Sequence, residues 1–587
     1  MENRRIILIA LLAVTIFFMY QAWQDDYGKQ AAPTPTTASL DGAVTVPAET
    51  DPGAGREIDS DTPTAVPAAP AADVTAGTTG DASSADEMLT VETDVLRAKI
   101  SLRGGEIRSL ELKHYPLSKD QPDVALPLLS DSGLQYAVFQ SGLAGTGEAL
   151  ASGDTPYRAA QTEYRLAEGS NVLEVRLEHE RADGVKVSKT YRFGRSSYRI
   201  GLEHGLDNGS AEALTVSPYT RFVRNEGLVG DLPKFVMTFL GIGFYENKPG
   251  SDDYRFVKTK LDNLDDDAFE TRQKNGWISI LQHYFVVAIL PPRDSEGVYS
   301  AKPARDGRYT AQYVATGVSV EAGSGQRFVS DLYVGPRLQD GVKWVDADGQ
   351  IQEGASLDAI APGLDYTIDY GILTPICEPL FWLLEKFHSF TGNWGVAIIL
   401  LTLVVKALFY KLSEAQYRSM AKMKKFAPRI QDIKERYDGD RERMSKAMMD
   451  LYKKEGFNPL AGCWPLLVQF PVFIALYWVL LESVELRQAD FALWINDLSA
   501  PDPFYVLPVL FGISFYVQQK WSGATATMDP MQQKIMNVMP IMMTAFFAFF
   551  QAGLVLYWLV SNLIGMAQQW FINRKLAGEG LGRAKPA

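Results

Sequence analysis

The first hydrophobic stretch of the chain is an unbroken apolar run over residues 6–23, which follows Arg4 and Arg5. Its length is close to the roughly 20 residues that cross a bilayer as a helix. The run ends in aromatic and acidic residues rather than in the small residues of a cleavage site. We therefore predict that residues 1–23 form an uncleaved transmembrane anchor with the arginines on the cytoplasmic side.

The next stretch, residues 24–86, contains almost no large apolar side chains and consists mainly of Ala, Pro, Thr, Gly and Asp. Such a segment cannot bury enough apolar surface to offset the entropy that ordering would cost. We predict a disordered tether on the outer side of the membrane.

Apolar and polar residues alternate in short runs between residues 87 and 370. Leu173, Val175 and Leu177 alternate with charged residues, and Asp183-Gly184 offers a hairpin turn before the next run. Similar runs cover 198–206, 283–290 and 328–334. Regular short strands are typical of a sandwich, so we predict a periplasmic all-β sandwich over 87–370.

The sandwich region shows no pattern of catalytic or metal-binding residues. Four of the five histidines lie here without metal-ligand spacing, and no nucleophile elbow is present. Two cysteines are too few for a disulfide scaffold. Acidic pairs such as Asp252-Asp253 are far more often solvated loops than glycosidase pairs. We expect no catalytic residue, metal or cofactor, and we keep a sugar-processing outer domain as an alternative.

After residue 371 the apolar residues recur at helical spacing. Over residues 371–391 the pattern predicts an amphipathic helix in the outer membrane interface. Residues 535–573 carry no charge, and one helix of that length would be about 60 Å long, so the run must fold back. We predict five spans in a helical core over 392–573, and six transmembrane helices with the anchor. The five cover residues 396–412, 459–481, 504–519, 535–550 and 553–572.

The charges agree with this division. Basic and acidic residues number 33 and 52 over 24–371, but 22 and 17 over 372–587, within a net charge of −13. The loop 413–456 holds twelve basic residues, whereas 486–503 holds only Arg487. The positive-inside rule therefore predicts that both termini are cytoplasmic and that the large domain is periplasmic. An acidic main body also argues against nucleic-acid binding.

The cytoplasmic loop 413–456 has a helical periodicity that Asp438-Gly439 interrupts, which predicts a helical hairpin. One face is basic and the other is rich in methionine, a flexible residue suited to varied apolar partners. A plain hairpin core with a solvated basic face is the alternative. A short, weakly basic cytoplasmic tail covers 574–587. The candidate contact residues are Met420, Met423, Met444 and Met448.

Lys406 lies about ten residues into the span 396–412, where a charge costs at least ~2.5 kcal/mol on insertion scales. Its side chain could extend toward the end of the span at Lys411. However, Thr402 and Tyr410 lie one turn away on either side, so the three residues form a polar stripe. No Asp, Glu or His lies deep in a span, which leaves the cation available to an incoming carboxylate. Polar positions of other spans that together could line a wet groove are Gln469, Asn537, Thr544, Tyr557, Ser561, Gly565 and Gln568.

Five segments of the helical region resemble the YidC family of bacterial membrane protein insertases, part of the YidC/Oxa/Alb group. They are SEAQYRSMAKM (413–423), NPLAGCWP (458–465), FALWINDL (491–498), DPMQQKIM (529–536) and GLVLYWLVSN (553–562). The likeness covers nearly all of 372–573. The anchor, tether and outer domain agree in layout with the Gram-negative form of the family.

The resemblance implies a five-helix core around a hydrophilic groove that receives the polar tail of a nascent membrane protein. It implies that Thr402, Gln469, Tyr557 and Trp558 line this groove or its lipid-facing slide. The family usually has arginine where this chain has Lys406, and more often tyrosine where it has Trp558. Lysine keeps the charge but lacks the bidentate fork of arginine, which favours electrostatic attraction over a fixed geometric contact.

The resemblance also implies a partner for each side of the membrane. The outer domain should be a mutarotase-like sandwich that contacts components of the Sec translocon. The cytoplasmic loops and tail should meet ribosomes and the signal-recognition receptor. The implied function is that of an inner-membrane insertase and chaperone without a chemical reaction. A transporter would usually show repeated halves, which the sequence lacks, and an intramembrane hydrolase lacks its HExxH motif here.

Overall fold

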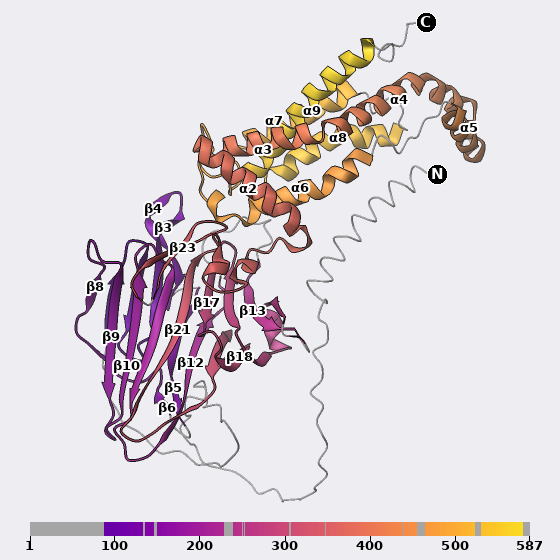
Figure 1. Cartoon of the computed structure of the whole chain (residues 1–587). Coiled ribbons are helices and arrows are strands. Elements are labelled where there is room, and N and C mark those ends of the chain that lie inside the picture. Colours follow the sequence, from indigo (N-terminus) through magenta and orange to yellow (C-terminus); the bar gives the residue numbers. More distant parts are fainter. Residues whose placement is uncertain are drawn as a thin grey trace, which may run out of the picture.

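The computed structural model describes residues 87–132, 135–145, 149–227, 239–248, 251, 253–304, 307–346, 348–437, 440–454, 464–522 and 530–578. The predicted anchor (1–23), the predicted tether (24–86) and the end of the tail lie outside the described residues. The described chain forms a β-sandwich and a helical bundle, which lies against one end of the sandwich (Figure 1).

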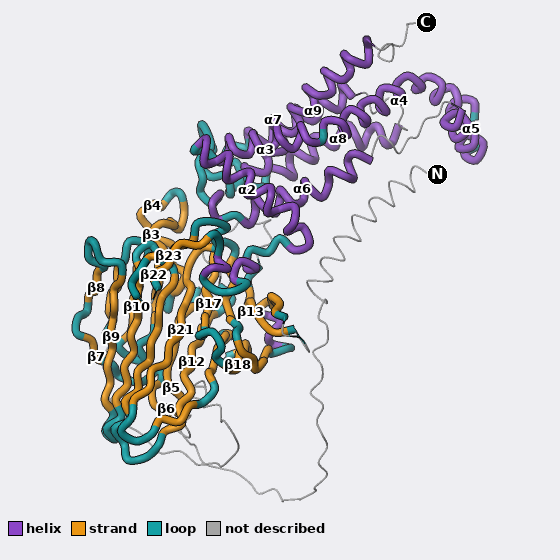
Figure 2. Tube along the Cα trace, viewed as in Figure 1, coloured by secondary structure: helices purple, strands orange, loops and turns teal. Residues whose placement is uncertain are grey.

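The sandwich consists of two large, mainly antiparallel sheets, which confirms the fold class predicted for this region (Figure 2). The first sheet contains β1 (Met88–Glu92), β2 (Leu96–Ser101), β3 (Ile107–Ser118), β4 (Gln121–Leu129), β5 (Ala137–Gly145), β6 (Ala149–Ala151), β8 (Glu163–Arg165), β12 (Leu214–Arg224), β15 (Phe269–Lys274), β18 (Glu296–Pro303), β19 (Tyr309–Ala315) and β20 (Val318–Val320). The second contains β7 (Arg158–Ala159), β9 (Val172–Glu180), β10 (Lys186–Gly194), β11 (Arg199–Asp207), β13 (Gly241–Asn247), β14 (Tyr254–Lys260), β16 (Trp277–Gln282), β17 (Phe285–Leu290) and β21 (Gly325–Pro336).

The predicted hairpin is present as β9 and β10, which pair with Leu177 opposite Lys189. Val175 and Leu177 are buried while their neighbours along β9 are exposed, as the alternation indicates. Gly184 in the turn has φ +85°, a conformation that glycine adopts without steric cost. The three other predicted runs correspond to β11, β17 and β21, so these sequence predictions are confirmed.

A short hairpin and three single turns of 3₁₀ helix connect the sandwich to the bundle. The hairpin pairs β22 (Val342–Val345) with β23 (Ile351–Gly354). The turns are η3 (Leu357–Ala359), η4 (Leu364–Thr367) and η5 (Gly371–Leu373). A further turn, η1 (Asp262–Asp265), lies between β14 and β15. Another, η7 (Val484–Leu486), follows the helix α6 (Trp464–Glu482) of the bundle.

The bundle contains eight described helices: α2 (Thr374–Thr391), α3 (Trp394–Leu408), α4 (Tyr410–Arg436), α5 (Arg441–Lys454), α6 (Trp464–Glu482), α7 (Val506–Ser522), α8 (Pro530–Phe547) and α9 (Ala552–Gly578). α2 ends at Thr391, the predicted end of the amphipathic helix, and a break at Gly392 separates it from α3. Gly392 ends α2 with φ +66°, and the Asn393 side chain accepts a hydrogen bond from the Val396 amide at 3.0 Å. These residues are ordinary helix-ending and helix-starting signals.

The run predicted as a span over 396–412 is bent in the structure. α3 ends at Leu408, α4 begins at Tyr410, and their axes differ by 63°. α4 therefore contains the start of the predicted cytoplasmic hairpin as well as the end of the predicted span. The sequence did not predict this bend, because Phe409 and its neighbours include neither proline nor glycine, the residues that usually mark a break.

Among the described helices, no single one is long and apolar enough to cross a bilayer. However, α3 and the first part of α4 (Tyr410–Ser419), which are bent relative to each other, are together long and apolar enough. The count of six transmembrane helices therefore stays a prediction. The same holds for the predicted domain boundaries and for the interfacial position of α2.

The sandwich and the bundle meet through a buried polar junction at the C-terminal end of α6. The Arg337 guanidinium pairs with the Glu482 carboxylate at 2.7 Å, and the two side chains are only 7% and 11% exposed. His283 Nε2 donates to the Leu481 carbonyl at 2.9 Å, so this neutral ring carries its proton on Nε2. Gln339 donates to the Ser483 hydroxyl at 2.8 Å. The contacts fix the end of α6 to the second sheet.

A second set of contacts joins the loop after α6 to the end of β3. Arg487 donates to the Pro116 carbonyl at 2.7 Å, and Lys119 pairs with Asp490 at 3.0 Å. Both large sheets therefore contact the bundle, one through β21 and one through β3.

Candidate functional site

Lys406 lies in the last turn of α3, on a helix that packs against α2 and α9. Its side chain is half-buried. The Lys406 carbonyl accepts a hydrogen bond from Gln568 of α9 at 3.0 Å. Among the residues that the structure describes, the Lys406 ammonium has neither an ion-pair partner nor a hydrogen-bond partner. It is a cation in an apolar helix, and the described part of the chain offers it no countercharge.

Thr402 lies one turn before Lys406 and is fully buried. Its hydroxyl donates to the Ile398 carbonyl of its own helix at 2.6 Å. This back-bond satisfies the hydroxyl within α3. Tyr410 is the first residue of α4 and is half-buried, so the bend at Phe409 interrupts the polar stripe predicted from Thr402 to Tyr410.

Tyr557 and Trp558 lie near the start of α9, in the apolar core of the bundle. The Phe473 ring of α6 stacks on Tyr557, with centroids 6.3 Å apart, and meets Trp558 edge-on at 4.6 Å. The Trp558 Nε1 donor is buried without a hydrogen-bond partner among the described residues. An unsatisfied buried donor costs free energy unless a partner arrives.

Ser561 lies one turn beyond Tyr557 and within hydrogen-bonding reach of its hydroxyl. Gln469 lies on α6, one turn before Phe473, and is half-buried. The structure thus places Tyr557, Trp558 and Ser561 of α9 together and faces the aromatic pair with α6. Lys406 contacts α9 further along, at Gln568. No described contact joins the Lys406 side chain to Gln469 or Tyr557.

Two further residues of α9 form contacts with other helices. The carbonyl of Gly565, a predicted groove position, accepts from the Tyr417 hydroxyl of α4 at 3.1 Å, and Asn562 donates to Ser514 of α7 at 2.8 Å. Neither Asn562 nor Ser514 was predicted as a groove position, since a single polar residue in an apolar run carries no distinctive signal. The two residues became recognisable only through their hydrogen bond.

The methionines of the predicted hairpin surface are only partly described. Met444 and Met448 are half-buried on α5, and Met449 is 39% exposed. The side chains of Met420 and Met423 lie outside the described residues, although their backbone belongs to α4. The role of these methionines as contacts for partner molecules stays a prediction.

An acidic sandwich joined by a buried junction to an apolar bundle defines a membrane protein with a large domain outside the bilayer. The outer surfaces of the helices agree with this class, because Leu408, Ile541 and Phe571 are each at least two-thirds exposed. Two family models cover this division. The model of the 60Kd inner membrane protein matches residues 386–579, and the model of the YidC periplasmic domain matches residues 88–383.

Curated relatives match over the whole chain. The membrane protein insertase YidC of Nitrosococcus oceani is 40% identical over 585 residues, which are 99% of this chain and 100% of the relative. The insertase YidC of Methylococcus capsulatus is 40% identical over 577 residues, 98% of this chain and 99% of the relative. The chain therefore belongs to the YidC family of membrane protein insertases, which are proteins of the inner membrane.

Two solved structures show weaker likeness. A crystal structure of an active YidC insertase with the first transmembrane domain resolved matches at 17% identity and a TM-score of 0.35, over 83% of this chain and 92% of that chain. A galactose mutarotase related enzyme from Lactobacillus acidophilus matches at 11% identity and a TM-score of 0.29, over 42% of this chain and 97% of that chain. At these scores neither carries an argument, and the mutarotase-like form of the sandwich stays a prediction.

Proposed function

We propose that this chain inserts membrane proteins into the inner membrane, alone or with the Sec translocon. The polar tail of the substrate enters a hydrophilic intramembrane groove, where Lys406 attracts its acidic groups. Thr402, Tyr410, Gln469, Tyr557, Trp558 and Ser561 line this groove. The observation that carries the proposal is the Lys406 ammonium, which has no countercharge among the described residues.

The physical basis is a balance of two transfers. Moving an apolar segment from water into lipid is favourable, whereas moving a polar tail into hydrocarbon is costly unless it finds partners. A groove with an available cation lowers the second cost for tails that carry carboxylates. The reaction needs no bond to form or break, so we propose a chaperone-like insertase rather than an enzyme.

The topology and partners belong to the same proposal. Six transmembrane helices place both termini in the cytoplasm and the sandwich in the periplasm. The basic hairpin of α4 and α5 meets ribosomes and the signal-recognition receptor, with Met420, Met423, Met444 and Met448 as contacts. The sandwich contacts components of the Sec translocon.

Replacement of Lys406 tests the groove. We expect Lys406→Arg to support insertion of a single-span substrate with an acidic tail, and Lys406→Ala and Lys406→Glu to reduce it about tenfold or more. A lost charged hydrogen bond of ~1.5 kcal/mol corresponds to about that factor. The measurement is the protease-protected fraction of substrate after depletion of the native protein.

Two controls define the outcome. Lys411→Ala removes an exposed cation five residues away and should leave insertion unchanged. A substrate with a neutral tail should be much less sensitive to Lys406→Ala. Equal insertion by all three Lys406 variants would refute the groove-cation model.

A further inference from the structure

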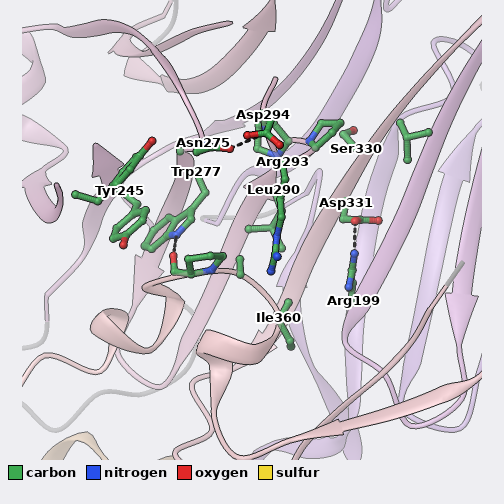
Figure 3. A pocket seen from close by; sticks show the side chains of 17 residues that line it. Arg199, Tyr245, Asn275, Trp277, Leu290, Arg293, Asp294, Ser330, Asp331 and Ile360 are labelled. Carbon is green, nitrogen blue, oxygen red and sulfur yellow. Dashed lines mark hydrogen bonds and ion pairs between the residues drawn. The ribbon is translucent and has the colours of Figure 1, made fainter. Parts of the chain in front are cut away.

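A cavity of about 580 Å³ lies on the second sheet of the sandwich, and all its lining residues belong to residues 199–362. Figure 3 shows Tyr245 and Trp277 along one side of it and the ion pair of Arg199 with Asp331 along the other. Its volume is within the usual range of ligand pockets. Neither the predicted nor the proposed function uses this cavity.

The cavity lies where the sheet is interrupted. β21 pairs with β11 along its length, from Tyr333 opposite Arg199 to Gly325 opposite Asp207. It pairs with β17 only from Pro336 to Asp331, because β17 ends at Leu290. Among the described strands, none pairs with Gly325–Ser330 on the β17 side.

Two prolines explain the interruption. Pro291 and Pro292 follow β17 directly, and a proline has no N–H to donate to a neighbouring strand. The chain therefore leaves the sheet at this point and crosses to β18 of the other sheet. The remaining half of β21 keeps an open edge.

The register identifies the backbone groups on this edge. Val334 N donates to the Tyr198 carbonyl at 2.9 Å, so even-numbered residues of β21 direct their peptide groups to β11. Odd-numbered residues direct theirs to the opposite side. On the open edge these are Val329 and Arg327. The Arg327 carbonyl accepts from the adjacent Gln326 side chain at 3.3 Å, which agrees with this direction.

The same residues connect the edge with the cavity. Val329 is 49% exposed, and Val329 and Asp331 both line the cavity. In a sheet, residues directly opposite each other present their side chains on the same face. A residue docked opposite Val329 would therefore direct its side chain into the cavity.

The far wall of the cavity is aromatic. Tyr245 stacks between Trp277 and Tyr254, with ring centroids 5.7 Å and 5.1 Å apart and interplanar angles of 8° and 16°. Trp277 is fixed because its Nε1 donates to the Pro362 carbonyl at 2.9 Å. Such a wall favours an aromatic or branched apolar side chain.

We propose that this site binds an extended polypeptide segment, which adds as a strand beside Val329 and Arg327 and places an aromatic side chain in the cavity. Strand addition supplies the main-chain hydrogen bonds, and the pocket supplies the selectivity. A sugar could occupy the cavity but would leave the open edge unpaired, so the geometry favours a peptide. The site is independent of Lys406 and goes beyond the proposed function.

A labelled peptide of sequence Thr-Val-Thr-Phe-Thr-Val-Thr tests the proposal by fluorescence anisotropy with the full chain in nanodiscs. In an antiparallel alignment with Phe opposite Val329, the Phe and the Val after it, opposite Arg327, direct their N–H groups to β21, whereas Leu290 of β17 already lies opposite Asp331. N-methylation of these two residues should weaken binding at least tenfold. N-methylation of the two Thr residues that flank Phe should instead leave binding nearly unchanged. Equal affinity of the two methylated peptides would overturn the proposal.

Substitutions in the protein provide the second arm. Val329→Arg should weaken peptide binding about tenfold, whereas Val318→Arg, at another exposed valine outside the site, should not. Tyr254→Ala should reduce the preference for Phe over Ala in the peptide. Wild-type affinity of Val329→Arg would overturn the proposal. Saturable binding of a disaccharide in the absence of peptide binding would overturn it equally and assign the cavity to a carbohydrate.

Discussion

Lys189 is a fully buried lysine in the interior of the sandwich. Its ammonium donates to the carbonyls of Gly104 at 2.6 Å and Ser141 at 2.9 Å, so it joins β10 of one sheet to the other sheet. Gly105 has φ +59°, and a side chain there would press against Lys189. Burial lowers the pKa of Lys189 to about 7, although the Glu106 carboxylate opposes the shift.

We predict that Lys189→Met destabilises the sandwich by ~2–3 kcal/mol, because the carbonyls it serves are left buried without a donor. The pH dependence provides a second readout. Between pH 7 and about 10.5 the unfolded chain binds the proton that the folded chain has released, so stability rises with pH over that window. Urea midpoints of the full chain at pH 7 and pH 9.5 measure this rise.

The Lys189→Met variant should lack that part of the rise. A matched control is Lys186→Met, which removes an exposed lysine three residues earlier on the same strand. If both variants keep the wild-type slope, the pKa of Lys189 is not perturbed as described.

Lys189 and Lys406 also show what can be predicted from a residue's position in the sequence. Lys406 was recognised because a charge within an apolar run stands out. In the alternating strand β10, Lys189 lies on the inward face between Val187 and Tyr191, whereas Lys186 lies on the outward face. The alternation therefore indicates that Lys189 points inward, but not which groups receive its charge, because its contact with Gly104 of the other sheet spans 85 positions.

At the scale of elements, Gly512 sets the distance between α7 and α8. A Cβ atom at this position would overlap the Thr544 hydroxyl of α8 and lie 3.1 Å from the Thr544 Cβ. The Thr544 hydroxyl also donates to the Pro540 carbonyl at 2.8 Å, which holds it in place. Small residues at such crossings allow close helix packing in membranes.

We predict that Gly512→Ala destabilises the bundle by ~1–3 kcal/mol, the usual cost of overpacking, despite the higher helix propensity of alanine. Gly565→Ala on α9 is the control, because its Cβ would have no neighbour closer than 3.5 Å. Thermal unfolding of the detergent-solubilised full chain compares the two. A melting temperature of Gly512→Ala equal to that of wild type would contradict the close packing.

Element boundaries were predictable where a residue type marks them. Gly392 and Asn393 ended and started helices as expected, and Asp183-Gly184 turned the chain between β9 and β10. The bend at Phe409 was not predictable, because the surrounding residues are all acceptable in a helix. There the packing of α3 on α2 and α9, and of α4 on α9, overrides the local preference.

At the scale of the whole molecule, the junction contains two buried groups with opposite pH behaviour. Burial lowers the pKa of His283 to about 4; the Arg337 and Arg487 charges act in the same direction, while Glu482 opposes them. Burial raises the pKa of Glu485 to about 7, and Asp340 adds to the rise. Both groups are neutral between about pH 4 and pH 7.

The stability contributions of these two groups have opposite slopes in the same pH range. Between pH 4 and 6.5 the unfolded chain protonates His283 and the folded chain does not, so stability falls on acidification. Between pH 4.5 and 7 the unfolded chain ionises Glu485 and the folded chain does not, so stability falls as pH rises. The wild-type junction should therefore be nearly insensitive to pH over this range.

Single substitutions should separate the two slopes. We predict that Glu485→Gln makes thermal stability rise between pH 4.5 and 6.5, and that His283→Gln makes it fall over the same interval. Differential scanning fluorimetry of the full chain measures both, with Asp123→Asn at an exposed carboxylate of β4 as a surface control. Parallel slopes in the two variants would contradict the assignment.

The junction between the sandwich and the bundle could not be predicted from the sequence, for a physical reason. The sandwich and the helical core could be predicted from periodicity, which is a local property. Arg337 and Glu482 are separated by 145 positions, and each looks like an ordinary charged residue at the end of an apolar run. Neither reveals that it will be buried against the other.

Because of the bend at Phe409, α4 extends away from α3 at a point next to the proposed groove. α4 has 27 residues, which correspond to about 40 Å at 1.5 Å per residue. A rotation of 10° about Phe409 would move the far end of α4 by roughly 7 Å over that length. Lys406 lies three residues before Phe409, and its carbonyl accepts a hydrogen bond from Gln568 of α9. We therefore expect that a partner bound at the tip of the hairpin of α4 and α5 shifts the surroundings of Lys406 through α4.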